Sequence, residues 1–527
     1  MPTLHWIGKD KVINHHLDVP FRVLEHGYGF PNGKKSKSVG GSGNRIIHGD
    51  NLEALKALLP EYEGKIKCIY IDPPYNTGKE QWLYTDKVNH PTIQKWFSKI
   101  VGKEGEDLSR DDKWLCMMYP RIKLLHRLLS DDGIFFCSID DYEQANLKLL
   151  LDEIFGTNNF INNVIWQRAF SPINTKKRFS PNHDFILCYA KKASQVEFSL
   201  PRTEDADNRY ANPDNDSRGD WTSSDLTVGP VIKEKLYQIT TPSGQTYLPP
   251  SGRCWVVTEE RFNELQSESR IWFGETGSNM PRLKRFKSDV KDGMTPLTVW
   301  TYKEVGHTQE AKKEIKQIFP ESSLPFDTPK PLKLMERLVQ LSTDKNAIIL
   351  DSFAGSGTTA HAVLNLNKQD GGNRKFILIE MENYAETITA ERVKRVIGGY
   401  ADKEGTGGGF DYYTLGHPIF TEEGILNESV PVKELRRYIF YTETQQALPD
   451  TAKNKDNPFL LGLHNQTAYY FFYEPGRATT LDHDFLATIR TKAEEYIIYA
   501  DNCTLTSEYL TMYAIRFKKI PRDITRF

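Results

Sequence analysis

At 527 residues, 39% hydrophobic and 26% charged, the chain has the balance of a soluble globular protein and the length for two to four domains with separate cores. No apolar stretch is long enough to span a bilayer and the first residues lack a signal-peptide pattern, so membrane and secreted classes are disfavoured and a cytoplasmic location is expected. The net charge of −2 argues weakly against a nucleic-acid binder, so any DNA binding must depend on local basic surface.

The first predicted elements follow a polar N-terminal arm. Residues 1–44 end in a stretch rich in glycine, serine and lysine, which predicts a flexible arm. From Arg45 the pattern is α/β, and the apolar run 66–71 predicts a strand covered on both faces. Apolar residues at helical spacing within 114–129 predict a helix that packs on the sheet. Further strands are expected at 134–139, 164–166 and 185–190, with a helix that Asp140 or Asp141 caps and that stops at Gly156.

The pattern changes in the middle of the chain. Between residues 195 and 320 Pro, Gly, Asn and Asp are frequent and aromatic residues interleave with basic ones, which predicts an inserted domain. A helix is expected again at 330–341, followed by strands at 347–350 and 376–379, and Thr406–Gly409 resembles a linker. The expected parts are the arm 1–44, the two halves of one domain at 45–194 and 321–405, the insert 195–320, and a mixed α/β domain at 410–527.

Cysteine usage indicates reduced thiols. The six cysteines are widely scattered and form no C-x-x-C pair, so mostly buried, free thiols are expected rather than disulfides or metal ligands. No metal site is predicted.

The first motif that carries chemistry, Asp72-Pro73-Pro74-Tyr75, follows the strand predicted at 66–71. Two consecutive prolines fix the backbone and remove two N–H donors, so a rigid turn with free carbonyls facing a cleft is expected. The Asp72 carboxylate and the Pro73 carbonyl are then placed to accept the two protons of an amino group, beside the aromatic ring of Tyr75. The alternative without function is an ordinary Pro-Pro turn.

The second motif, Asp351-Ser-Phe353-Ala-Gly355-Ser-Gly357, follows the strand predicted at 347–350 and opens a helix. Glycines at 355 and 357 allow the backbone to approach a ligand where a side chain would clash, and the helix start favours a carboxylate. Glu380, which ends the next strand, is placed to accept bonds from two ribose hydroxyls. Because ligands bind at the carboxyl ends of strands in a doubly wound sheet, one cleft is expected to hold both ligands.

A dinucleotide-binding site is the main rival interpretation of the second motif. Gly355-x-Gly357-x-x-Ala360, with an acidic residue about 20 positions later, also fits the dinucleotide fingerprint. A dehydrogenase would leave Asp72–Tyr75 without a role. The chain contains no G-x-x-x-x-G-K-[ST], which disfavours a P-loop phosphate site.

The order of the two motifs resembles the β group of DNA amino-methyltransferases, in which the catalytic motif precedes the cofactor motif and a target-recognition domain lies between them. The chain looks closer still to the modification (Mod) subunit of type III restriction-modification systems. This resemblance covers roughly residues 45–400, and it implies a permuted S-adenosylmethionine-dependent methyltransferase fold with a doubly wound, mostly parallel sheet, an inserted target-recognition domain and a C-terminal mixed α/β domain. The segments that carry it are Ile47–Glu53, Tyr70–Gly78, Gly252–Trp255, Trp272–Gly274, Pro281–Arg285 and Phe353–His361.

The resemblance implies methyl transfer from S-adenosylmethionine to the N6 amino group of an adenine flipped out of double-stranded DNA. The residues implied for catalysis are Asp72, Pro73, Pro74 and Tyr75. Those implied for the cofactor are Asp50 at its adenine, Glu380 at its ribose, Thr328 and Lys330 at its methionine carboxylate, and Asp351, Phe353, Gly355 and Gly357 along its length. Candidates for DNA contacts are Arg253, Arg282, Lys284, Arg285 and Lys287. A helix cap remains the alternative for Asp50, and solvated charge the alternative for Lys330 and the basic run.

The resemblance also implies partners. Mod subunits pair with a second copy and with a helicase-nuclease subunit, and the chain contains no nuclease motif, so DNA cleavage would need that second protein. The C-terminal domain is the candidate assembly surface. The alternatives are an adenine methyltransferase that works alone, a DNA-binding specificity subunit without catalysis, and an NAD-dependent dehydrogenase. A cytosine C5 enzyme is disfavoured because no Pro-Cys pair supplies its nucleophile.

Overall fold

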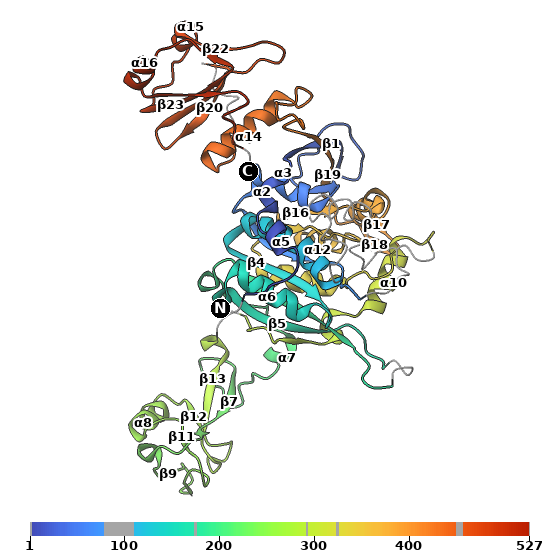
Figure 1. The fold of residues 1–527 in the computed structure, drawn as a ribbon. Helices are drawn as coiled ribbons and strands as arrows, with labels where there is room; N and C mark the ends of the chain where they lie inside the picture. Colours follow the sequence, from blue (N-terminus) through green and yellow to red (C-terminus); the bar gives the residue numbers. More distant parts are fainter. Residues whose placement is uncertain are drawn as a thin grey trace. The chain divides into compact units, whose positions relative to one another are not determined.

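A ten-stranded sheet forms the centre of the larger of the two units into which the chain folds (Figure 1). The larger unit contains Met1–Glu197 and Leu297–Phe527, and the smaller unit contains Phe198–Pro296. The structure is a computed structural model, and it describes residues 3–77, 110–172, 177–290, 293–322, 326–449 and 457–525. Gly78, the last residue of the first resembling segment, lies outside the described residues.

The central sheet is mostly parallel, as predicted. Its strand order is β1-β19-β2-β16-β15-β3-β4-β6-β5-β14, and each neighbouring pair from β19 to β4 is parallel. Strand β6 is antiparallel to both β4 and β5, and β1 is antiparallel to β19. The strands are β1 Arg22–Pro31, β2 Arg45–His48, β3 Ile66–Ile71, β4 Leu129–Ile139, β5 Phe160–Gln167, β6 His183–Ala190, β14 Val299–Trp300, β15 Ile348–Asp351, β16 Lys375–Glu380 and β19 Gly409–Pro418.

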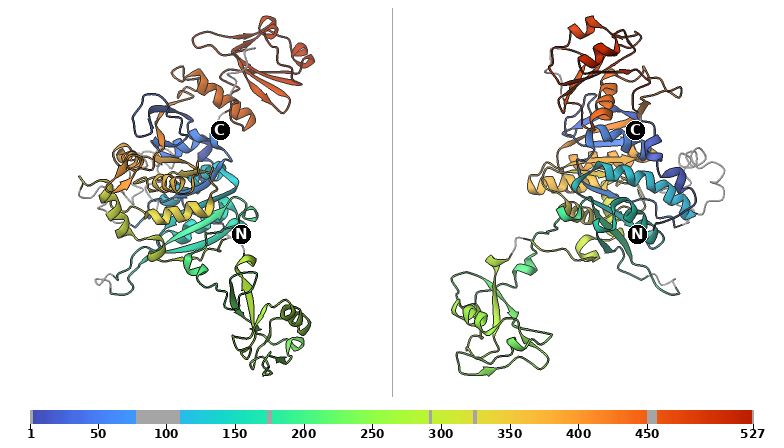
Figure 2. Two further views of the ribbon diagram at one scale, coloured as in Figure 1. Left: turned by 180° about the vertical axis from the view of Figure 1, so that it is seen from behind. Right: turned by 60° about the vertical axis from the view of Figure 1, so that its left-hand side comes forward.

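Two layers of helices cover the sheet. Helices α3, α5 and α6 lie on the face that is turned forward in Figure 1, and α11, α12 and α13 lie on the face seen from behind in Figure 2. Helix α5 packs through the predicted stripe, in which Met118, Ile122 and Leu125 are fully buried. The helices are α3 Asn51–Tyr62, α5 Arg110–Leu128, α6 Gln144–Phe155, α11 Leu332–Ser342, α12 Thr358–Asp370 and α13 Glu391–Gly398.

Three sequence expectations differ from the structure. The N-terminal arm contains strand β1, which pairs along its length with β19, and Tyr28 stacks on Tyr412 with ring centroids 5.1 Å apart. Because β19 is inserted between β1 and β2, the boundary expected at 410 falls at the start of a strand of the central sheet. Helix α6 starts after Glu143 rather than after Asp140 or Asp141.

The smaller unit has a core of its own, built from aromatic and aliphatic side chains such as Trp255, Phe262 and Ile271. It ends earlier than the predicted insert, because β14 pairs with β5 of the central sheet and returns the chain to the larger unit at residue 297. Its elements are α7 Glu204–Asp207, β7 Trp221–Asp225, β8 Thr227–Val228, β9 Ile239–Thr240, β10 Thr246–Tyr247, β11 Cys254–Trp255, α8 Glu259–Ser267, β12 Ile271–Trp272 and β13 Arg282–Phe286.

The C-terminal part of the larger unit is mixed α/β, as expected. Strands β21, β23 and β25 are parallel and alternate with short helices, and β20 pairs antiparallel with β21. Its core continues into the central sheet region, since Val23 and Ile419 cluster with residues of α14. The elements are α14 Val432–Thr444, β20 Leu460–His464, β21 Thr467–Phe471, β22 Thr480–Leu481, α15 His483–Ala487, β23 Glu495–Ala500, β24 Asn502–Cys503, α16 Ser507–Met512 and β25 Ile515–Lys519.

The prediction of mostly buried, free thiols is confirmed. All six cysteines are free; Cys503 is half-buried and the other five are buried. No helix in the described part of the chain has both the length and the apolar character needed to cross a membrane. The short elements are α1 Lys9–Val12, α2 His15–Asp18, α9 Tyr302–Val305, α10 Thr308–Ile318, β17 Gly399–Tyr400 and β18 Lys403–Glu404.

Candidate active site

The two sequence motifs emerge side by side from the central sheet. Strands β3 and β15 are parallel neighbours, and Asp351 at the end of β15 is in register with Tyr70 of β3. The residues that follow both strands therefore meet at the same edge, as expected for a doubly wound sheet. They line one cavity of about 370 Å³. Of the residues predicted for catalysis and cofactor binding, its lining contains Asp72, Pro73, Tyr75, Thr328, Lys330, Asp351, Phe353 and Gly355.

Asp72 and Tyr75 share a cationic neighbour, Lys330, which the resemblance assigned to the cofactor carboxylate and not to Asp72. The ammonium of Lys330 forms an ion pair with Asp72 Oδ2 and lies 5.3 Å from the centre of the Tyr75 ring. The other carboxylate oxygen, Asp72 Oδ1, is buried. Burial and the Asp72 charge raise the pKa of Tyr75 well above its ordinary value, so its ring remains a neutral phenol.

The proline turn is braced from behind. The indole N–H of Trp114, on α5, donates to the Pro74 carbonyl at 2.7 Å. Two free carbonyls were expected at this turn. The Pro74 carbonyl faces helix α5 and Pro74 lies outside the cavity lining, whereas Pro73 lines the cavity. Asn76 continues the turn with a φ of 59° and donates a hydrogen bond to the buried Glu143.

The carboxylate of Asp351 is held by the loop that follows it. Its Oδ1 accepts the backbone N–H of Phe353 at 3.1 Å, and its Oδ2 accepts the hydroxyl of Thr359 at 2.5 Å. Burial raises its pKa to about 7, although these two hydrogen bonds act in the opposite direction. Asp351 therefore changes charge near neutral pH while it faces the cavity.

Glu380 supports the glycine loop from the end of β16. Its Oε2 accepts the N–H of Gly355 at 2.7 Å, and its Oε1 accepts the N–H of Glu382 at 3.0 Å. Burial raises the pKa of Glu380 to about 8. The side chain lies behind Gly355 and is not part of the cavity lining, so its expected bonds to a ribose stay a prediction.

Gly357 shapes the loop without lining the cavity. It precedes α12 with a φ of 78°, a left-handed conformation that favours glycine, and a Cβ there would lie 3.1 Å from the carbonyl oxygen of Thr389. On the same side, the buried Arg392 donates to the hydroxyls of Ser356 at 3.0 Å and Thr358 at 2.7 Å. Both hydroxyl residues line the cavity, so Arg392 holds the start of α12 in place.

Asp50 caps a helix beside this site. Its Oδ1 accepts the backbone N–H groups of Leu52 at 2.8 Å and Glu53 at 3.3 Å, and its Oδ2 accepts a bond from Arg121 at 3.3 Å. Asp50 is thus a helix cap, and its expected contact with a cofactor adenine stays a prediction. Because the Gly49 N–H donates to the Glu380 carbonyl at 3.0 Å, the cap still lies next to the end of β16.

Two ion pairs in the cavity were not found from the sequence. Arg168 pairs with Asp184 at 2.8 Å, and Lys312 pairs with Asp327 at 2.6 Å. Burial raises the pKa of Asp184 to about 6. Asp184 is the second residue of the antiparallel strand β6, which brings it to the same edge as the carboxyl end of β4. The sequence signal that could have placed Asp184 in the cavity is its position directly before the strand predicted at 185–190.

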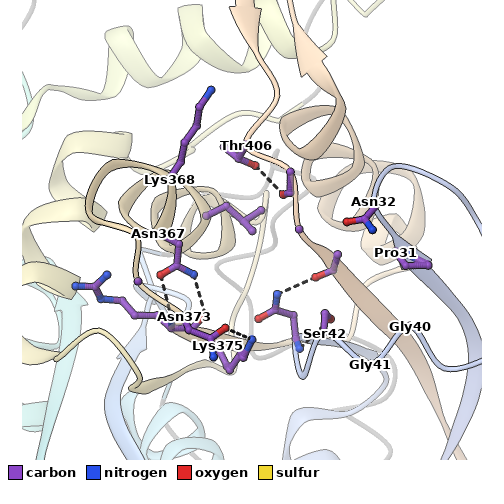
Figure 3. Close-up of a pocket in the computed structure, with 17 residues that line it drawn as sticks. Pro31, Asn32, Gly40, Gly41, Ser42, Asn367, Lys368, Asn373, Lys375 and Thr406 are labelled. Atoms are coloured by element: carbon purple, nitrogen blue, oxygen red, sulfur yellow. Dashed lines mark hydrogen bonds between the residues drawn. The ribbon is translucent and has the colours of Figure 1, made fainter.

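A second cavity, of about 420 Å³, lies at the opposite edge, where β2, β16 and β19 begin (Figure 3). Glycines and amide side chains such as Asn367 and Asn373 line it, together with the basic Lys368 and Lys375. Its lining contains neither a carboxylate nor an aromatic ring, so it offers no charged acceptor for an amino group and no aromatic surface for stacking a base. The cavity at the strand tips is therefore the candidate active site.

The basic residues predicted to contact DNA lie in the smaller unit, and they do not behave alike. Lys284 is buried, pairs with Asp214 and with Asp216, and so its charge is neutralised inside the unit. Period-two alternation along β13 places it on the buried face with Phe286, which corrects the expectation of a phosphate contact. The side chains that stay at the surface are Arg253, Arg282, Arg285 and Lys287.

A comparison with known proteins assigns this arrangement. The DNA methylase family (N6_N4_Mtase) matches residues 66–391, which contain both strand-end motifs and the smaller unit. This chain belongs to the DNA methylase family. The cavity at the tips of β3 and β15 is thus the candidate active site of a DNA methylase.

Curated relatives of this DNA methylase include subunits of restriction-modification enzymes. It is 35% identical over 382 residues to the type III StyLTI Mod subunit of Salmonella typhimurium, covering 67% of this chain and 57% of that protein. It is 29% identical over 435 residues to the EcoP15I Mod subunit of Escherichia coli, covering 70% and 65%. It is 32% identical to the type II methyltransferase M.KpnI of Klebsiella pneumoniae, covering 66% and 82%. The chain spans less than two thirds of the length of either Mod subunit.

Solved structures match the DNA methylase over a similar share of its length. The match to the cytosine-N4-specific PvuII DNA methyltransferase covers 66% of this chain and 86% of that protein, with a TM-score of 0.33 and 15% identity. M1.HpyAVI covers 66% of this chain and 98% of its own, with a TM-score of 0.30 and 16% identity.

Proposed function

We propose that this DNA methylase transfers a methyl group from S-adenosylmethionine to the N6 amino group of adenine, as the modification subunit of a type III restriction-modification system. The observation that carries the proposal is the shared cavity, which Asp72 and Tyr75 line from one strand end and Asp351 and Gly355 from the next. Its volume lies in the range of small-molecule sites. The likeness to the StyLTI and EcoP15I Mod subunits supports the type III assignment.

The target adenine is bound at the Asp72 end of the cavity. The carboxylate of Asp72, which lines the cavity, accepts one amino proton, and the neighbouring Pro73 carbonyl accepts the other. Two acceptors on one amino group favour a pyramidal nitrogen, whose lone pair is then directed away from the ring. Tyr75, kept neutral, stacks on the base. Because the amino group is paired inside a duplex, the base must first leave the helix.

The cofactor is held at the Asp351 end. When bound, S-adenosylmethionine supplies a methyl group on a positively charged sulfur. The acidic, buried Asp351 suits a cationic ligand, and the start of α12 at Thr358 suits its carboxylate. Gly355 lines the cavity with a φ of 52° and leaves room for close approach of a ligand to the backbone. The protein contributes position and charge, and no covalent intermediate with a side chain is needed.

Replacing Asp72 by alanine tests the role of the acceptor. Asp72→Ala removes the carboxylate that redirects the lone pair, so methyl transfer should fall by about 100-fold or more while cofactor binding persists. The measurement is transfer of labelled methyl groups to DNA from a host without adenine methylation, together with titration calorimetry for the cofactor. Sequencing of the product, with detection of modified adenines, identifies the base and the recognised site. Near-normal turnover by the variant would end the assignment.

A methyltransferase that acts without a restriction subunit is the second candidate. The match to the type II methyltransferase M.KpnI, which covers 82% of that protein, favours it. Both candidates share the same cavity and the same chemistry, and they differ in their partners. The type III assignment requires that a helicase-nuclease subunit and a second copy of the chain co-purify with it, whereas full methylation by the isolated monomer favours the second candidate.

A further inference from the structure

Lys330 occupies the place that the proposed function reserves for the target amine. Its ammonium, an N–H donor like an amino group, is paired with Asp72 Oδ2 and lies 5.3 Å from the centre of the Tyr75 ring. The side chain of Lys330 is 11% exposed and that of Asp72 is 23% exposed, so the pair is largely shielded from water. A base cannot use Oδ2 while Lys330 holds it, and Oδ1 is buried.

The backbone limits how Lys330 can move. Pro329 and Pro331 flank it and fix φ on both sides, so the ammonium leaves Asp72 through rotation of its own side chain. A lysine side chain is a flexible four-carbon stem that carries a point charge, which makes such a displacement inexpensive. Lys330 therefore needs only another anion within reach.

The cofactor end of the same cavity provides the place for that anion. The other two cations of the lining, Arg168 and Lys312, are already paired with Asp184 and Asp327. Thr358, at the start of α12, lines the same cavity as Lys330. Lys330 is the cation of this lining that is paired with Asp72, so it is the one that a carboxylate entering near Thr358 can draw away. Exchange of one carboxylate for another keeps the lysine paired, so no buried charge is left alone.

We propose that Lys330 is a positioning residue that couples the two ends of the site: it holds the amine-binding carboxylate of Asp72 until the carboxylate of the bound cofactor draws its ammonium away. The target base therefore gains Asp72 only after the cofactor has bound. This coupling rests on the proposed function, because it assigns the cofactor's amino-acid part to the region of Lys330. Coupling between two such sites is typically worth a factor of about 5 to 150.

A double-mutant cycle on the full chain tests the coupling without DNA. The ligands are S-adenosylhomocysteine, which has the amino-acid carboxylate, and 5′-methylthioadenosine, which lacks it; their affinities are measured by titration calorimetry. Asp72→Asn removes the competing charge and frees Lys330, so it should tighten S-adenosylhomocysteine binding by about fivefold or more and leave 5′-methylthioadenosine binding unchanged. Lys330→Met should weaken S-adenosylhomocysteine binding, and adding Asp72→Asn to it should have no further effect.

The cycle separates this inference from the proposed function. If the wild type binds both nucleosides but Asp72→Asn changes neither affinity, or changes both equally, the coupling through Lys330 is overturned and the proposed function stands. If Asp72→Asn still tightens S-adenosylhomocysteine binding in the Lys330→Met background, a different group carries the effect and the inference also fails. A wild type that binds neither nucleoside overturns both proposals.

Discussion

Single carboxyl groups in the cavity titrate close to neutral pH, and burial is the main cause. Burial raises the pKa of Asp351 to about 7 and that of Asp184 to about 6, whereas Asp72 is paired with Lys330. An acid with a raised pKa loses its proton more easily when a cation binds beside it. The charge state of the cavity therefore depends on what occupies it.

Asp351 predicts a pH dependence of cofactor binding. A positively charged ligand beside Asp351 favours its ionised form and lowers its pKa, so binding releases a proton and the affinity should rise with pH through about 7. Titration calorimetry with S-adenosylmethionine from pH 6 to pH 8, in buffers of different ionisation enthalpy, measures both effects. Asp351→Asn should bind more weakly and lose the dependence. A wild-type affinity that falls as the pH rises would contradict the assigned role.

At the scale of elements, helix α12 offers a matched pair of glycines. Gly357 before its start and Gly371 after its end both have left-handed φ angles, 78° and 66°. A Cβ at Gly357 would lie 3.1 Å from the Thr389 carbonyl oxygen, whereas a Cβ at Gly371 would meet nothing within 4 Å. The two positions thus share the backbone strain and differ in the contact.

Alanine at each glycine separates the strain from the contact. Both variants should lose about 1–2 kcal/mol of stability from the left-handed conformation, seen as similar decreases in Tm. Gly357→Ala should also displace Gly355 and Ser356, which line the cavity, and so weaken S-adenosylhomocysteine binding about tenfold or more, equivalent to about 1.4 kcal/mol. Gly371→Ala should bind normally. Equal affinities of the two variants would show that the contact with Thr389 does not shape the site.

The elements around both motifs could be predicted from sequence because their signals are local. Apolar runs give β3 and β16, and helical spacing gives α5. Contacts between distant residues leave no such signal: Lys330 reaches Asp72 across 258 positions, and Trp114 reaches Pro74 across 40. These long-range contacts decide which carbonyl is free and which charge Asp72 meets. The membership of both motifs in one site was predictable, whereas the ion pair within it was not.

At the scale of the molecule, the last strand of the central sheet comes from the region that the sequence assigned to a linker and a separate domain. Gly407 and Gly408 suggest a flexible connection, yet β19 begins directly after them and joins β1 to β2. Its partners lie roughly 370 to 400 positions earlier, and no local pattern reveals them. The C-terminal part therefore begins beyond β19.

Two truncations test this boundary. A chain that stops after residue 420 keeps β19 and loses the remaining C-terminal part, so it should still bind S-adenosylhomocysteine, with a lowered Tm because Val23 loses the neighbours of its cluster. A chain that stops after residue 408 also loses β19 and leaves β1 and β2 without their shared partner, so it should be insoluble or fail to bind. Calorimetry and thermal unfolding provide the readouts. Equal behaviour of both chains would contradict a role for β19 in the sheet.

The pairing of β3 with β15 has a consequence for biosynthesis. Strand β15 leaves the ribosome about 280 residues after β3, which at roughly 5–20 residues per second is a delay on the order of 14–56 seconds. Throughout that interval the apolar run Ile66–Ile71 has an open hydrogen-bonding edge on one side. The nascent polypeptide is thus exposed to misassociation. Chaperones that shield unfinished sheets should raise the yield of folded protein, and they should act mainly before residue 351 has been translated.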